Sequence, residues 1–320
     1  MCILITGSAG FIGYHLADRL LQDKYTVLGI DYLPACRDLL LVKARLQRLQ
    51  KYTNFCFQEV DIGDADKLAL LFSQYPITRV IHLAGKTGIR GSRLYPNSYA
   101  EINILGWINV LENCRRFTIP KVILASSSSV YSNSQKLPFR EDERSGTPAS
   151  IYGTTKQTQE ALAYNYSFLY GMDITVLRLF TVYGAFYRSD MALSIFARNL
   201  WRGDRVIISG NGQVQRDFTH VSDVVEVFVR SLTRGGTGYA VYNVGYGQPV
   251  PLTRVIQFMA EYWQKEVIVE FQPLAPEELV INHADTGKLK ADFHYAPQVS
   301  IEAGIPAFLD WYESFYGHGL

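Results

Sequence analysis

The sequence has few of the features that mark a disulfide-linked or metal-binding protein. It contains 4 cysteines in 320 residues, and Cys2, Cys36, Cys56 and Cys114 are too widely spaced for a C-x-x-C motif, a zinc site or a disulfide framework. We expect all four to be small buried hydrophobic residues. We expect no bound metal.

Charge and hydropathy argue against a nucleic-acid-binding protein and against a membrane protein. The 31 basic and 30 acidic side chains give a formal net charge of +1, so no long-range field attracts nucleic acid or an anionic bilayer. No run of about eighteen uncharged apolar residues occurs, and the chain starts with strand-like residues rather than a basic, apolar leader. We therefore expect a cytoplasmic protein that binds neither nucleic acid nor membrane. The basic residues Lys43, Arg45, Arg48 and Lys51 have helical spacing and are expected to form a solvated helix face.

Strand-like and helix-like segments alternate through the first half of the chain. Strands are expected at residues 2–6, 25–30, 54–58, 79–83, 121–126 and 174–179, and helices at 14–22, 64–74, 99–116 and 152–170. Apolar strands separated by helices predict an α/β fold with a doubly wound parallel Rossmann sheet covered on both faces. After about residue 180, shorter elements and more turns predict a smaller α/β domain. We expect a first domain over 1–180, with 216–245 returning to it, and a second over 181–320.

The first thirty-one residues read as strand, glycine turn, helix, strand and acid. Gly7 allows a tight reversal, Gly10 lets backbone N–H groups approach a pyrophosphate, and Gly13 lets the helix pack close to the strand. Asp31 ends the second strand, where a carboxylate accepts hydrogen bonds from the adenosine ribose hydroxyls. This pattern predicts a bound dinucleotide, NAD rather than NADP, although Arg37 could soften the preference.

A tyrosine and a lysine at the start of a later helix form a second constellation. Tyr152 and Lys156 are four residues apart and share one helix face, so the ammonium can favour ionisation of a phenol that otherwise titrates near pH ~10. Upstream, the run Ser126 to Ser129 begins where a parallel strand ends, and doubly wound sheets bind their ligands at that edge. The two motifs predict a proton-transfer site beside the dinucleotide.

Together these motifs resemble the extended short-chain dehydrogenase/reductase family, in particular its nucleotide-sugar epimerase and dehydratase group. The resemblance covers nearly the whole chain and rests on residues 6–13, 82–85, Asn103 with Gly106, 126–131, Tyr152 with Lys156, 178–184, 191–193, 216–219 and 284–285. The chain is most similar to those members of the group that act on UDP-glucuronate.

The resemblance implies NAD as cofactor and a UDP-sugar as substrate, held by the first and second domains respectively. The residues expected to contact NAD are Gly7, Gly10, Phe11, Ile12, Gly13, Asp31, Asp61, Ile62, Leu83, Ala84, Lys86, Asn103, Tyr152 and Lys156. Those expected to contact the substrate are Arg90, Ser127, Ser128, Ser129, Thr181, Arg188, Met191, Arg216 and Asp285, with Arg216 on the nucleotide diphosphate.

The residue types imply a mechanism. Tyr152, as a phenolate, takes the proton of a sugar hydroxyl while NAD takes hydride from the same carbon, and Ser127 steadies the developing oxyanion. A 4-epimerase then lets the 4-keto sugar turn over and returns hydride to the opposite face. With UDP-glucuronate the product is UDP-galacturonate.

Two serines discriminate among the reactions of the group. Dehydratases of the group carry an Asp-Glu pair where this chain has Ser128 and Ser129, so dehydration is not expected, and decarboxylases carry a Glu in place of Ser129. Oxidation at carbon 4 of a uronate gives a β-keto acid that loses carbon dioxide easily, so an epimerase must restrain the carboxylate. The serine hydroxyls, Thr181 and Arg188 are candidates for this task.

Other interpretations stay open from the sequence. UDP-glucose 4-epimerase and UDP-glucuronate decarboxylase use the same scaffold, and an NAD-binding sensor or structural protein would need no base. Segments 99–116 and 152–170 could pair across a homodimer, as the resemblance suggests. Glu277-Glu278 and Ser132 depart from the group, which usually has Gly-Asp and Gly there.

Three further polar positions have structural explanations. His82 ends an apolar strand and is expected to be packed and hydrogen-bonded rather than catalytic. Asp217 and Asp223 flank His220 without metal-like spacing, so they are expected to serve local turns and a helix start.

Overall fold

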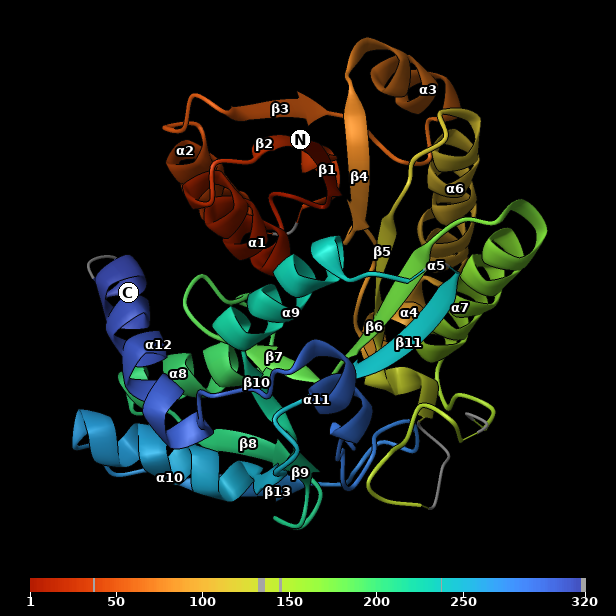
Figure 1. Ribbon diagram of the computed structural model, residues 1–320. Coiled ribbons are helices and arrows are strands. Elements are labelled where there is room, and N and C mark those ends of the chain that lie inside the picture. The colour runs from red at the N-terminus through yellow and green to blue at the C-terminus, as the bar shows by residue number, and fades with distance from the viewer. Residues whose placement is uncertain (37, 132–135, 144–145, 237, 318–320) are drawn as a thin grey trace. The chain divides into compact units, whose positions relative to one another are not determined.

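The computed structural model describes residues 1–36, 38–131, 136–143, 146–236 and 238–317 (Figure 1). The chain divides into two compact units. The first comprises Met1–Asn133, Arg144–Arg178 and Val225–Tyr242, and the second comprises Ser134–Glu143, Leu179–Val224 and Asn243–Leu320. Compared with the sequence-based division, the returning segment is shorter, and residues 134–143 belong to the second unit instead of the first. Arg37 and Ser132 lie outside the described residues.

The first unit is built on a seven-stranded sheet. Its strands are β1 (Cys2–Thr6), β2 (Thr26–Asp31), β3 (Phe55–Glu59), β4 (Ile77–His82), β5 (Val122–Ser127), β6 (Ile174–Leu179) and β11 (Tyr239–Val244), in the order β11-β6-β5-β4-β1-β2-β3. The strand β1 pairs in parallel with both β2 and β4. The strand order reverses beside β1, and doubly wound sheets bind ligands outside the carboxyl ends of the strands at such a point. The predicted parallel, doubly wound sheet is confirmed.

Helices follow most strands of this unit. They are α1 (Phe11–Gln22), α2 (Leu39–Leu49), α3 (Ala65–Gln74), α4 (Ile89–Leu94), α5 (Pro96–Ala100), α6 (Gly106–Arg116), α7 (Ile151–Tyr170) and the later part of α9 (Val221–Thr233), with 3-10 turns η1 (Leu33–Ala35) and η3 (Ser128–Tyr131) and a π turn η2 (Glu101–Leu105). The single helix predicted at 99–116 is instead α5, the π turn and α6, joined through helical backbone. Isolated π turns within helices often mark functional positions.

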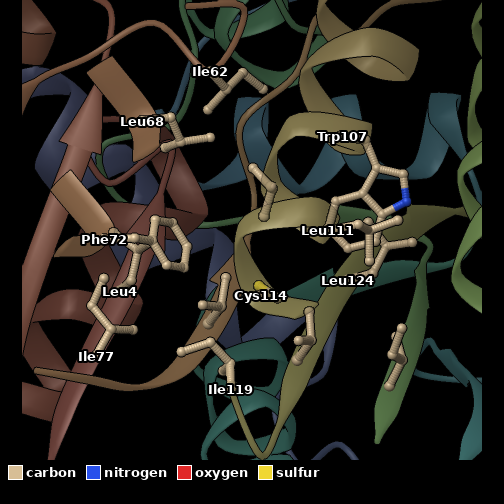
Figure 2. Packing of buried hydrophobic residues seen from close by; sticks show 14 of the residues in the cluster. Leu4, Ile62, Leu68, Phe72, Ile77, Trp107, Leu111, Cys114, Ile119 and Leu124 are labelled. Atoms are coloured by element: carbon tan, nitrogen blue, oxygen red, sulfur yellow. The ribbon is translucent and has the colours of Figure 1, made fainter. Parts of the chain in front are cut away.

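An apolar core packs α3 and α6 against the sheet. Leu68 and Phe72 of α3 and Leu111 of α6 meet Leu4 of β1 and Leu124 of β5 (Figure 2). The helix residues recur every three or four positions and the strand residues point to one face, as amphipathic packing requires. Each fully buried Leu or Phe side chain contributes about 1.5–3 kcal/mol, so this core stabilises the packing of α3 and α6 on the sheet.

The cysteines depart partly from the expectation. Cys114 is buried in the α3–α6 core, which fits a small hydrophobic residue, whereas Cys2, Cys36 and Cys56 are only half-buried. The expectation of burial is therefore wrong for these three. Cys2 is the first residue of β1, Cys36 follows η1, and Cys56 lies on β3 at the sheet edge, positions where fewer neighbours cover a side chain.

The second unit contains short strand pairs, several helices and the start of α9. In its described part, β7 (Thr181–Tyr183) pairs in parallel with β10 (Phe218–His220), β8 (Val206–Ser209) in parallel with β13 (Val269–Gln272), and β9 (Gln215–Arg216) antiparallel with β12 (Val250–Pro251). The helices are α8 (Ala192–Arg202), α10 (Leu252–Trp263), α11 (Gly287–Phe293) and α12 (Ile301–Tyr316). Within the described ranges, no helix has both the length and the apolar character to cross a bilayer.

Candidate active site

The glycine turn after β1 leaves no room for side chains. Gly7 has φ +74°, and a Cβ on it would lie 2.7 Å from the backbone nitrogen of Ala84. A Cβ on Gly13 would collide with the carbonyl oxygen of Gly7, and one on Gly10 would lie 3.0 Å from the same oxygen. Helix α1 starts after Gly10, and no described side chain caps it. A helix N-terminus next to an unobstructed backbone turn suits a pyrophosphate, so these residues fit a dinucleotide.

Asp31 fixes the turn to the end of β2. Its Oδ2 accepts a hydrogen bond from the Ala9 N–H at 3.0 Å and its Oδ1 accepts one from the Tyr32 N–H at 2.9 Å. Burial raises the pKa of this carboxyl, while the two N–H groups and Arg45 oppose that shift. The Gly10 N–H is a third backbone donor to this carboxyl, and a carboxylate with about four acceptor sites still has capacity for a ribose hydroxyl.

Arg45 corrects the expectation of a solvated basic face on α2. Its side chain is buried, with 3% of the residue exposed, and Nη1 donates to the Ala9 carbonyl at 2.9 Å. Lys43, Arg48 and Lys51 are exposed as expected. Arg45 stands on the same helix face as Val42, Leu46 and Leu49, all buried, so helical periodicity could have revealed its burial.

Thr6 and Asn103 hold the loop after β4. Thr6 Oγ1 accepts hydrogen bonds from the Leu83 and Ala84 N–H groups at 3.2 and 3.1 Å. Asn103, in the π turn, accepts from the Lys86 N–H at 2.8 Å and donates to the Lys86 carbonyl and to Thr155 Oγ1, each at 2.9 Å. Asn103 is fully buried, so its described contacts tie the loop to α7. A contact of Asn103 with NAD stays a prediction.

His82 is packed and hydrogen-bonded, as predicted. Its Nδ1 lies 2.8 Å from Thr6 Oγ1, and its ring stacks on Trp107 with centroids 4.6 Å apart. Burial, with a smaller contribution from Lys156, lowers the pKa of His82 to about 3. The imidazole is therefore neutral at ordinary pH.

The serine turn, residues 126–131, consists of the last two residues of β5 and the whole of η3. Ser127 Oγ accepts from the Ser129 N–H at 3.2 Å and donates to Ser129 Oγ at 3.1 Å. Helix α7 begins beside it, with Ser150 Oγ accepting from the Gly153 N–H at 3.0 Å. A Cβ on Gly153 would lie 2.7 Å from the Ser129 carbonyl oxygen. Glycine at this position brings the first turn of α7, which carries Tyr152, against the serines.

Lys156 is buried one helical turn after Tyr152. Its Nζ donates to the Ala125 carbonyl and to Gln159 Oε1, both at 2.9 Å. Burial lowers the pKa of Lys156 to about 8, and Glu160 opposes the shift. Tyr152 is also buried, and its ring contacts that of Tyr99 edge to face. The predicted effect of the ammonium on the phenol stays a prediction.

Of the remaining first-unit candidates, Asp61 and Ile62 lie on the loop after β3 and Arg90 lies on α4. Asp61 Oδ1 accepts from the Gly63 N–H at 2.8 Å, and the Ile62 carbonyl accepts from Asn109 Nδ2 at 2.9 Å. Ile62 packs against Gly106, where a Cβ would not fit. Arg90 is exposed on α4.

Arg188 and Met191 lie close together in the second unit. Arg188 forms a two-pronged ion pair with Asp190, at 2.9 Å from Nε and 2.7 Å from Nη2, and the two side chains are 32% and 34% exposed. The Met191 N–H donates to the Arg188 carbonyl at 3.3 Å, just before α8 begins. Thr181 is the first residue of β7.

Arg216 and Asp285 lie near each other because Asp217, the residue after Arg216, accepts a hydrogen bond from Ala284, the residue before Asp285. Arg216 Nη1 donates to the Gln215 and Leu279 carbonyls at 2.9 and 2.8 Å. Asp217 Oδ2 accepts from the Ala284 N–H at 3.0 Å, immediately before Asp285. Burial lowers the pKa of Arg216, and the nearby Glu278 opposes that shift. Glu278 therefore brings negative charge to the residue predicted to bind a diphosphate.

Asp217 and Asp223 correct the expectation of local turns. Asp217 also accepts from the Tyr246 N–H at 2.7 Å, and Asp223 accepts from Tyr295 Oη and the Val299 N–H at 2.5 and 2.9 Å. Both carboxylates therefore organise distant backbone, a role that nearby sequence cannot reveal. Among the described residues, no group of three or more His, Cys, Asp or Glu side chains is arranged to hold a metal.

Comparison with known proteins identifies the family. The model of the NAD dependent epimerase/dehydratase family matches residues 3–245. The chain belongs to this family. The match begins in β1 and extends through β11, so it includes the glycine turn, the serine turn and the Tyr152–Lys156 pair.

Individual epimerases resemble this family member over their whole length. A UDP-glucuronate 4-epimerase from Thermodesulfobacterium geofontis is 37% identical over 309 residues, 96% of this chain and 95% of its own. A UDP-glucuronic acid 4-epimerase from Bacillus cereus, solved with UDP-glucuronic acid and NAD, has a TM-score of 0.93 at 32% identity and covers 99% of this chain and 100% of its own. A UDP-glucose 4-epimerase from Thermotoga maritima, solved with UDP-glucose, has a TM-score of 0.89 at 29% identity, covering 98% and 99%.

Sequence reasoning missed the burial of three charged residues of this epimerase/dehydratase family member, Arg45, Glu160 and Arg178. Arg45 supports the glycine turn, and Glu160 with Arg178 forms an ion pair behind the serine turn, at 2.7 Å between Nη2 and Oε2. A signal was present for Arg178, because it is the one charged residue of β6, a strand whose other residues are apolar except for Thr175. A charge inside a buried strand requires a partner.

Proposed function

We propose that this protein catalyses the NAD-dependent 4-epimerisation of UDP-glucuronate to UDP-galacturonate. One observation carries the proposal: the chain matches UDP-glucuronate 4-epimerases over nearly its full length in sequence and in fold, while keeping Ser127, Tyr152 and Lys156 in one unit. NAD, when bound, accepts a hydride from carbon 4 of the sugar and returns it to the opposite face, which passes the sugar through a 4-ketone.

The first unit has the residues to hold NAD. The side-chain-free turn at Gly7, Gly10 and Gly13 and the N-terminus of α1 accommodate the pyrophosphate. Asp31 can still accept hydrogen bonds from the ribose hydroxyls. Its negative charge would repel the extra phosphate group of NADP, which NAD does not have.

Proton transfer belongs to Tyr152. Its phenolate accepts the proton of the sugar 4-hydroxyl and later returns it. The Lys156 ammonium, with a pKa of about 8, is charged near neutrality and favours the ionised phenol. The Ser127 hydroxyl accepts from the Ser129 N–H, and its proton turns from Ser129 Oγ to the sugar oxygen on which negative charge develops.

The substrate carboxylate must be restrained to prevent its loss from the 4-keto sugar. We assign this task to Ser128, Ser129, Thr181 and Arg188. Arg188 now forms its ion pair with Asp190, and a substrate carboxylate offers the same two-pronged acceptor. Arg216 would meet the diphosphate and Asp285 the remaining nucleotide.

We also propose a homodimer. Large apolar side chains are exposed on α4, the π turn and α7 of the first unit, among them Leu94 at 66%, Leu105 at 57% and Phe168 at 74%. A second copy of the chain can cover such helix faces in a symmetric pairing. A cytoplasmic location remains a prediction.

The test incubates the purified protein with UDP-glucuronate and no added NAD, because an epimerase regenerates its cofactor in every turnover. UDP-galacturonate, a product of unchanged mass, supports the proposal. Loss of the carboxyl group would instead indicate the decarboxylase, and turnover of UDP-glucose alone would contradict the carboxylate argument. Bound NAD with no turnover of any UDP-sugar would favour the sensor. Tyr152→Phe is the control, expected to retain NAD and lose turnover about a hundredfold or more.

A further inference from the structure

A buried ion pair lies behind the serine turn. Glu160 is on α7, one helical turn after Lys156, and Arg178 is on β6. Arg178 Nη2 donates to Glu160 Oε2 at 2.7 Å, and Nε donates to Oε1 at 3.0 Å. The two side chains are only 7% and 6% exposed. The pair is thus isolated from water inside the first unit.

The same pair holds both ends of the serine turn. Ser126 Oγ donates a short hydrogen bond to Glu160 Oε1. Arg178 Nη1 donates to Tyr131 Oη at 2.6 Å, and its guanidinium lies 4.7 Å from the centre of the Tyr131 ring. Ser126 directly precedes Ser127, and Tyr131 closes η3. One carboxylate and one guanidinium therefore restrain the residues on either side of the reactive hydroxyl.

Stability alone is a weak reason for this arrangement. Burying two charges costs several kcal/mol per ion in solvation, and apolar residues of the same volume would often stabilise a fold at least as well. A bidentate pair adds directional hydrogen bonds, which fix geometry more strictly than apolar contacts do. Geometry is what an oxyanion-stabilising hydroxyl needs, because its donor must point at an oxygen whose charge is only developing.

We propose that Glu160 and Arg178 are positioning residues for the chemical step, acting through Ser127. The pair orients the serine turn so that the Ser127 hydroxyl meets the sugar oxygen that reacts. The inference rests on the proposed epimerase function. A second ion pair of the same unit, Lys121 with Asp173 at 2.8 Å, lies at the other ends of β5 and β6 and supplies a matched control.

The decisive variant is Glu160→Gln, which removes the charge and keeps the shape. We expect kcat for UDP-glucuronate to fall about ten- to a hundredfold, since small misplacements of a reacting group cost about this much. KM should change by less than about twofold and the content of bound NAD should stay unchanged. Asp173→Asn should retain wild-type kcat, even where it lowers stability.

A double variant separates positioning from general damage. If Glu160 acts through Ser127, Glu160→Gln should cost less than about twofold in a Ser127→Ala background. The same further loss in both backgrounds, or a wild-type kcat for Glu160→Gln, would overturn the proposal. Should Glu160→Gln not fold, Tyr131→Phe removes a single hydroxyl from the network and undergoes the same cycle.

Failure of the proposed function itself would be visible in the wild-type protein, as absent turnover. Hydrogen exchange then tests the restraint without activity. Exchange at residues 125–131 should be faster in Tyr131→Phe than in Asp173→Asn, and equal exchange would contradict the role of the pair.

Discussion

Gly13 of α1 lies directly against the carbonyl oxygen of Gly7, with no space for a Cβ between them. This contact brings the first turn of α1 close to the end of β1, where the backbone N–H groups can face a pyrophosphate. The cofactor cradle, by which we mean the turn formed by Gly7, Gly10 and Gly13, therefore requires that residue 13 have no side chain.

Gly13→Ala should therefore lose NAD. The methyl must displace the turn or the helix, and we expect a loss of about 1–3 kcal/mol in stability, as overpacking of tight sites costs, together with a preparation poor in bound dinucleotide. Gly235→Ala is the control, because nothing lies within 4 Å of its Cβ position. Thermal unfolding and cofactor content measure the two effects. Equal NAD content in both variants would contradict the cradle.

Asp31→Asn tests the ribose contact. An amide retains an acceptor for the Ala9 N–H but weakens the hydrogen bonds to ribose, since bonds to a charged group contribute about 1.5–3 kcal/mol. We expect NAD to bind about ten- to a hundredfold more weakly, and NADP to lose less because a repulsion disappears. Titration with both reduced cofactors, followed by fluorescence, provides the measurement. Asp23→Asn, which affects only a surface ion pair with Arg19, should match the wild type.

Arg188→Gln tests recognition of the uronate. Loss of the guanidinium should lower kcat/KM for UDP-glucuronate about ten- to a hundredfold and leave UDP-glucose, which has no carboxylate, unaffected. A rise in decarboxylated product would show that Arg188 also restrains the 4-keto sugar. Arg205→Gln removes another ion-paired arginine of the second unit and serves as control. A parallel loss for both sugars would count against the assignment.

His82 predicts how stability depends on acid. The pKa of His82 is about 3 in the folded protein and 6.5 in the unfolded chain. Between these two pH values the unfolded chain binds a proton at His82 and the folded protein does not. The free energy of unfolding therefore decreases as pH falls, by roughly 2 kcal/mol at pH 5. His82→Phe retains a ring beside Trp107 and should show a shallower decline between pH 6.5 and 5. Denaturant unfolding at several pH values gives the two slopes, and identical slopes would refute the prediction.

Local patterns predicted the first unit well because its signals are short-range. The glycine turn, the acid at Asp31 and the spacing of Tyr152 and Lys156 each follow from strand or helix periodicity over a few residues. The family match and the sheet order confirm the family and the fold that these motifs predicted.

Features set by distant contacts were not predictable in this way. The π turn forms where Asn103 meets Lys86 and Thr155. Asp217 receives its hydrogen bonds from residues about thirty or more positions away, and residues 136–143 join the second unit through a bridge between Phe139 and Ala284. These hydrogen-bond partners meet only once the chain has folded, so the spacing of residues within a short stretch of sequence does not reveal them.

The segment that returns to the first unit has a consequence for dissecting this protein. In the sheet, β6 is flanked by β5 and by β11, which arrives from residues 239–244. A fragment ending at residue 178 would leave β6 as an edge strand with unpaired backbone N–H and C=O groups. Such groups can pair with a strand of another molecule. Attempts to express the amino-terminal half alone should yield aggregates unless the later strand is supplied.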